Sequence, residues 1–219
     1  MFNFIKEKKE KAKELELYYN SLINDFSNED IYDNQSEKLL NFFGDAKELK
    51  KTIKLILVSD TNNNLDELRF ADYVYRYSDY DACIILGNIS ENDLNIIKKY
   101  VNNKKIYSLD SLPDIENINK KIIKINNVKV LGYKTDSYNH IDSIKELNSL
   151  SSSDVLITYS NRYIEGQNGI FGINYYIFKN NVPYHIHGSS LKPYKDRMIN
   201  NTKEISIYEF EYVVLPLNE

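Results

Sequence analysis

Hydrophobic and polar positions divide the chain into two parts near residue 50. In residues 1–50 the apolar side chains recur every three or four residues, for example at Leu15 and Tyr18, and this spacing predicts amphipathic helices. A second helix is predicted from Asn34, which forms a capping pattern with Glu37. We expect residues 1–50 to form a helical arm that either packs on its own domain or binds a partner or a second copy.

From Ile53 onwards, continuous apolar runs alternate with helical patterns. Buried strands are predicted at "IKLILVSD", "DACIILGN" and "KKIYSLD". Helical spacing lies between them, in "NLDELRFADYVYRY" and "ENDLNIIKKYVNN". This strand-helix alternation predicts a mainly parallel sheet with right-handed crossovers.

After Pro113 the predicted strands become shorter. The stretch "KIIKINNVKVLGY" predicts two strands joined by a tight Asn-Asn turn, and "DVLITYS" and "PYHIHGS" predict further strands. Helices are predicted at "HIDSIKELNSL" and "INYYIFKNN", and the end, "MINNTKEISIYEFEYVVL", predicts an antiparallel pair. Residues 51–219 are therefore expected to form one α/β domain.

Composition narrows the class of protein. The chain has 219 residues, 42% hydrophobic and 27% charged, with a net charge of -4, which is typical of a globular protein and argues against a nucleic-acid partner. Its one cysteine, Cys83, lies in an apolar run and allows no disulfide within the chain, which favours the reducing cytoplasm. No apolar run approaches the roughly 20 residues that cross a bilayer, so we expect no membrane partner.

Polar residues follow the predicted strands, where open α/β sheets place their chemistry. In chain order these strand ends read "SDTNNNLDEL", "LGNISEND", "YSLD", "TYSNRY" and "HGSSLKPY". Their order and spacing resemble the calcineurin-like metallophosphoesterases, in particular the small bacterial phosphodiesterases, whose blocks are D-x-H, G-D-x-x-D, G-N-H-D, a lone H and G-H-x-H. The resemblance covers roughly residues 53–215. It implies a four-layer α/β/β/α sandwich of two mixed sheets.

The resemblance also implies a site for two divalent metals such as Mn, Fe or Zn. They lie about 3.5–4 Å apart and clamp a phosphate while a bridging hydroxide attacks phosphorus. Asp60 matches the ligand aspartate of the first block. Asn62 stands at the histidine position of that block, and Asn88 at the bridging aspartate of the second. A neutral amide bridges two cations poorly, so the motif is degenerate at its central position.

The later blocks are degenerate as well. Only Asp110 remains of the third block, and Tyr159 stands at the histidine position of the fourth. In the fifth block Ser189 replaces a histidine, while the nearby His187 is common in the family but is not a usual ligand. The predicted vestigial cleft therefore consists of Asp60, Asn62, Asn88, Asp110, Tyr159, His187 and Ser189.

This inventory predicts a degenerate phosphoesterase that serves as a binding or scaffold protein, with no catalytic residue and no cofactor. Asp60 is the only retained metal ligand. The expected partner is a protein, or a second copy bound through the N-terminal helices. Two alternatives stay open: an active metal-dependent phosphoesterase with an altered site, and a nucleotide or phosphate binder that does not hydrolyse. The sequence leaves open whether the chain is an enzyme, and the loss of metal ligands favours that it is not.

One further cluster is suggested by spacing alone. His185 and His187 lie two residues apart on a predicted strand and so point to one face. They form either a metal half-site with Asp60 or a hydrogen-bonded pair, since a metal site needs three or more ligands.

Overall fold

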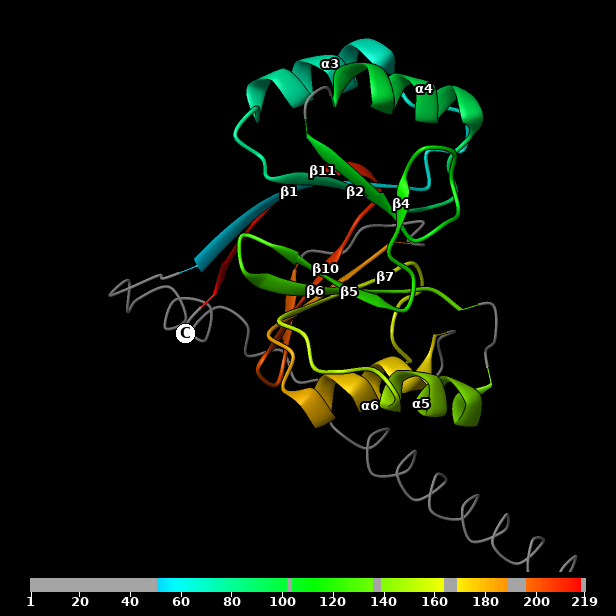
Figure 1. Ribbon diagram of the computed structural model, residues 1–219, viewed down its shortest axis with the longest axis vertical. Helices are drawn as coiled ribbons and strands as arrows, with labels where there is room; N and C mark the ends of the chain where they lie inside the picture. The colour runs from blue at the N-terminus through cyan, green and yellow to red at the C-terminus, as the bar shows by residue number, and fades with distance from the viewer. Residues whose placement is uncertain (1–50, 102–103, 136–138, 164–168, 189–195, 218–219) are drawn as a thin grey trace, which may run out of the picture.

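The computed structural model describes residues 51–101, 104–135, 139–163, 169–188 and 196–217. The predicted helical arm at 1–50 lies outside these residues. The described chain is layered: two helices, a sheet, a second sheet and two further helices (Figure 1). Helices α3 (Glu67–Arg76) and α4 (Glu91–Tyr100) cover one outer face, and α5 (His140–Asn148) and α6 (Phe171–Asn180) cover the other. The predicted four-layer sandwich is therefore confirmed.

The first sheet has the strand order β11-β1-β2-β3-β4. Strands β1 (Lys51–Ser59), β2 (Ala82–Gly87), β3 (Lys105–Ser108) and β4 (Glu116–Asn117) are parallel, and β11 (Glu209–Leu217) pairs antiparallel to β1. All six residues of β2 are buried, because helices cover one face of the sheet and the second sheet covers the other. This burial explains the continuous apolar runs in the sequence.

The second sheet has the order β5-β6-β7-β8-β10-β9. Strands β6 (Val128–Tyr133), β7 (Val155–Thr158), β8 (Tyr184–His187) and β10 (Thr202–Ser206) are parallel. The edge strands β5 (Lys121–Ile125) and β9 (Arg197–Ile199) are antiparallel to their neighbours. Asn126 and Asn127 join β5 to β6 with φ of 47° and 66°, so the predicted tight Asn-Asn turn is confirmed.

The C-terminal part differs from the predicted antiparallel pair. Strands β9 and β10 form a hairpin in the second sheet, but β11 crosses to the first sheet and pairs with β1. The alternation along β11 gives the reason. Val213, Leu215 and Leu217 point into the core between the sheets, while Phe210 packs beneath α3. A place in the first sheet buries one face of β11 in this core and Phe210 beneath the helix.

Four apolar clusters hold the layers of the described chain together. The largest lies between the sheets and includes Leu55, Ile84, Ile157 and Ile186. Two more fix the helix pairs to the outer faces of their sheets, and the smallest joins α5 to α6. None of the helices in the described part of the chain is long and apolar enough to span a membrane.

Candidate functional site

The polar residues that follow β1, β2, β3, β6 and β7 meet where the two sheets face each other. The Asp60 amide donates to the carbonyl of Gly87 at 3.1 Å, which joins the ends of β1 and β2. From the second sheet, Tyr159 follows β7 and its hydroxyl reaches Asp60. We call this region the cleft; its described members are Asp60, Asn62, Gly87, Asn88, Asp110, Lys134 and Tyr159.

The carboxylate of Asp60 is the centre of the cleft. Its Oδ1 accepts hydrogen bonds from Asn88 Nδ2 at 3.1 Å and from the Tyr159 hydroxyl at 2.9 Å. Its Oδ2 accepts one from Ser59 Oγ at 2.7 Å. The structure therefore brings together three of the predicted residues, Asp60, Asn88 and Tyr159, and links the two sheets through one carboxylate.

The backbone around this carboxylate is left-handed. Asp60, Asn62, Asn63 and Asn88 have φ of 57°, 48°, 66° and 56°. Aspartate and asparagine adopt this region at lower cost than other residues with a side chain, because their polar groups bond to nearby backbone. Asn62 does so, with Nδ2 donating to the carbonyl of Asp60 at 3.4 Å. Such conformations concentrate at functional sites and help to fix the direction of side chains.

Asp110 lies in the same region, paired with a lysine. Lys134 Nζ donates to Asp110 Oδ1 at 2.5 Å, and the same ammonium lies 4.7 Å from the centre of the Tyr159 ring. The two charged side chains are 21% and 32% exposed, so they are partly desolvated. Lys134 is not predicted by the sequence patterns, because it follows β6, which they indicate only as half of a hairpin. In the structure β6 is also parallel to β7, so its carboxyl end lies beside those of the other strands.

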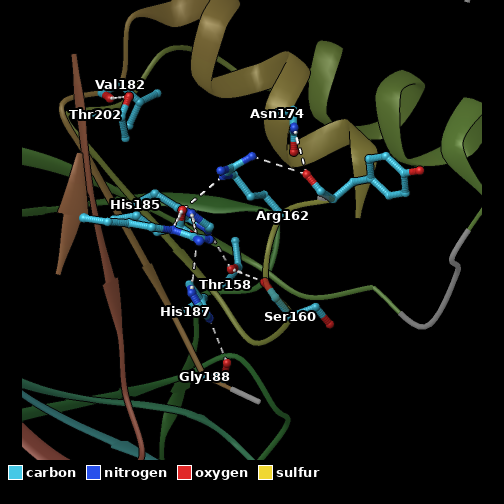
Figure 2. Close-up of polar contacts among 12 residues, drawn as sticks. Thr158, Ser160, Arg162, Asn174, Val182, His185, His187, Gly188 and Thr202 are labelled. Carbon is cyan, nitrogen blue, oxygen red and sulfur yellow. Dashed lines mark hydrogen bonds and ion pairs between the residues drawn. The ribbon is translucent and has the colours of Figure 1, made fainter. Parts of the chain in front are cut away.

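The predicted His187 belongs to a second polar group, on the outer face of the second sheet (Figure 2). This group is centred on the fully buried Glu204. Arg162 Nε donates to Oε2 at 3.0 Å, Arg197 donates through Nε and Nη2 at 3.1 Å each, and His187 Nε2 lies 3.3 Å from Oε1. We call these residues, together with His185, the Glu204 cluster.

His185 is fully buried and neutral within this cluster. Thr158 Oγ1 donates to the carbonyl of Ser160 at 2.6 Å, so it accepts from His185 Nε2 at 3.0 Å. Burial lowers the pKa of His185 to about 3; Glu204 opposes this change, and the neighbouring His187 and arginines reinforce it. The neutral ring is therefore the stable form at neutral pH.

Glu204 is ionised in the folded protein. Burial alone would raise its pKa, but the hydrogen bond from His187 and the charges around it outweigh burial and lower the pKa below its ordinary value. The cluster thus resembles a structural ion-pair network more than a catalytic site, since its arginines hold the carboxylate in the charged state.

The Glu204 cluster and the cleft are connected through Gly188. His187 Nδ1 donates to the carbonyl of Gly188 at 2.9 Å. A Cβ atom at Gly188 would lie 2.2 Å from Ser59 Oγ, which is the group that donates to Asp60. Only glycine allows this approach of the backbone to Ser59.

The residues of the cleft do not fit a two-metal centre. Around Asp60 they offer a neutral amide, a phenol and a hydroxyl, and the second carboxylate, Asp110, already binds an ammonium. Leu109 stands at the histidine position of the third block, has no donor atom in its side chain, and is buried in the core between the sheets. In the described ranges no three His, Cys, Asp or Glu side chains are grouped so that they could hold a metal ion, and this includes the set of His185, His187 and Asp60. Ser189 lies outside the described residues.

Comparisons with solved structures match this architecture. One crystal structure is 14% identical, with 75% of this chain and 95% of that chain covered and a TM-score of 0.53. The chain therefore shares the α/β fold of that structure. The protein TT1561 of Thermus thermophilus is 12% identical over 71% of this chain and 89% of its own, with a TM-score of 0.49.

A predicted phosphoesterase from Streptococcus pneumoniae TIGR4 is 9% identical over 75% of this chain and 84% of its own, with a TM-score of 0.40. No protein-family model and no curated protein matches the sequence. The resemblance seen in the sequence is therefore confirmed at the level of the fold, and identities this low show the fold alone.

Proposed function

We propose that this protein is a phosphoesterase-fold protein that binds a protein partner and does not hydrolyse phosphoesters. The observation that carries the proposal is the state of Asp60. Its carboxylate accepts hydrogen bonds from Ser59, Asn88 and Tyr159, so neutral donors of the protein surround the one retained ligand of the resembled family.

The chemistry of phosphoester cleavage supports this proposal. Metal ions accelerate it by neutralising the negative charge that develops in the transition state and by lowering the pKa of the attacking water. Asn88 at the bridging position has no charge to offer a cation. Lys134 is the cation of the described cleft, and it is paired with Asp110. These residues offer neither an activated water nor an uncommitted cation for a phosphate.

The charge of the cleft also bears on the alternative of a phosphate or nucleotide binder. Its described charged side chains are the carboxylates of Asp60 and Asp110 and the ammonium of Lys134, which leaves one excess negative charge. A phosphate would be repelled by that charge. A protein surface remains the favoured ligand, and residues 1–50 are the proposed contact for it or for a second copy. The single buried Cys83 fits a cytoplasmic setting.

Turnover of bis-p-nitrophenyl phosphate with added Mn²⁺ tests the proposal. The intact chain and its Asp60→Ala variant are compared from parallel preparations. We expect the same background rate from both, because Asp60 supports no reaction. Turnover by the intact chain that Asp60→Ala abolishes would refute the proposal and establish an active phosphoesterase.

A further inference from the structure

We propose that the Lys134 ammonium is a resident cation of the cleft, which supplies from within the protein the positive charge that bound metals would otherwise bring. The inference deepens the proposed function, because it explains how a phosphoesterase fold keeps its cleft ordered without metal ligands.

Lys134 is positioned so that its side chain joins the two sheets. Its backbone amide donates to Asn119 Oδ1 at 2.8 Å, which fixes the residue at the carboxyl end of β6. Its side chain then crosses to Asp110, which follows β3 in the other sheet, and the ion pair measures 2.5 Å. One ammonium therefore joins the two sheets at the edge where their strand ends meet.

The Lys134 ammonium contacts an aromatic ring as well as a carboxylate. It lies 4.7 Å from the centre of the Tyr159 ring, a distance at which a cation is attracted by an aromatic face. The hydroxyl of the same tyrosine donates to Asp60. The ammonium thus contacts Asp110 directly and is linked to Asp60 through the Tyr159 side chain.

Gly87 leaves space beside the Lys134 ammonium. A Cβ atom at this position would lie 3.2 Å from Lys134 Nζ, 3.2 Å from Asp110 Oδ2 and 2.8 Å from Tyr159 Cδ2. The ammonium, the carboxylate and the ring therefore press against the backbone of the β2 end. A side chain at Gly87 would displace the Tyr159 ring first, because that contact is the shortest, so the glycine leaves room for the ring that faces the ammonium.

The Lys134 ammonium supplies the counter-charge for Asp110. Without it, Asp110 would be a partly buried charge with no counter-charge of its own, which is costly. A free cation from solution would then be attracted to the cleft. Lys134 fills the place beside Asp110 with a cation that belongs to the chain and cannot dissociate into solvent.

Thermal unfolding of the full chain tests this inference, with and without added Mn²⁺. Lys134→Met is compared with Lys124→Met, a change to an exposed lysine on β5. We expect Lys134→Met to lower Tm by roughly 2–4 °C and Lys124→Met to leave it unchanged, because only the first change leaves a carboxylate without its partner. Lys134→Arg, which keeps the charge, should retain most of the wild-type Tm.

Two results decide whether Lys134 acts through its positive charge. Adding Asp110→Asn to Lys134→Met should recover most of the lost Tm, and Mn²⁺ should raise the Tm of Lys134→Met but not that of wild type. Equal Tm for the two Met variants, additive losses in the double variant, or the same Mn²⁺ response in wild type and Lys134→Met would each overturn the inference. The double variant decides the case if Lys134→Met does not fold. Turnover by wild type would overturn the proposed function alone.

Discussion

Replacing Glu204 with glutamine should destabilise this protein more than any change to a surface charge. The side chain of Glu204 is 0% exposed, and that of its partner Arg162 is 6% exposed. The second guanidinium, Arg197, is 17% exposed. Glutamine keeps the shape of glutamate but removes its charge, so two largely buried cations would lose their common counter-ion. The amide NH₂ of the glutamine would also face an arginine N–H group, and two donors cannot form a hydrogen bond with each other.

The magnitude follows from burial. Removing one partner of a buried ion pair costs about 3–5 kcal/mol, because the remaining charge is left desolvated and unpaired. For a chain of this size, about 1 kcal/mol corresponds to a Tm shift of roughly 2–4 °C. Glu204→Gln is therefore expected to lower Tm by roughly 6–20 °C.

Urea unfolding followed by far-UV circular dichroism measures this loss. The matched control is Glu209→Gln, which removes a salt bridge of 2.7 Å whose side chains are 62% and 35% exposed. That change should cost about 0–1 kcal/mol, since water and salt screen exposed pairs. If Glu204→Gln and Glu209→Gln lose the same free energy of unfolding, the cluster is not a buried ion-pair network and the reasoning is wrong.

Three further predictions concern His185, Cys83 and Gly87. The pKa of His185 is about 3 in the folded chain against an ordinary 6.5, so its stabilising effect is present above about pH 6.5 and is lost as the pH falls towards 3. Between about pH 7 and pH 5 the free energy of unfolding should fall by about 2 kcal/mol because of His185. The His185→Gln variant should lack this part of the pH dependence. Equal pH dependence in the variant and the wild type would contradict the prediction. Burial raises the pKa of Cys83 to about 12, so the thiol should not react with Ellman's reagent in the native protein. The thiol should react in the urea-unfolded chain. Rapid labelling of the native protein would show that β2 is accessible. Gly87→Ala should cost roughly 1–3 kcal/mol in urea unfolding through its clash with Tyr159 and its φ of +152°, and unchanged stability would show that the cleft has spare room.

The layered fold was predictable because its strongest signals are local. Strands buried on both faces require the unbroken apolar runs seen in β1 and β2, and such runs alternate with helical patterns. The helix at α6 was harder to recognise, because buried residues occupy most of its surface and leave little periodicity. The placement of β11 could not be read from the sequence, because its pairing with β1 joins segments at opposite ends of the described chain.

The candidate site was predictable in part for the same reason. Asp60, Asn88 and Tyr159 each follow a buried strand, and parallel strands bring such residues to one edge. Lys134 was missed because only the pairing of β6 with β7 reveals its strand end as a member of that edge. Glu204 was missed because a charged residue within an alternating strand is usually exposed, and its partner Arg162 lies 42 residues away.

We propose that the cleft is organised by its own side chains and not by metal ions. Elemental analysis of the purified native chain tests it most directly, with the protein prepared in medium containing Mn, Fe and Zn. We expect far less than one metal ion per chain. Two metal ions per chain that are absent from the Asp60→Ala variant would contradict this proposal and indicate a two-metal phosphoesterase.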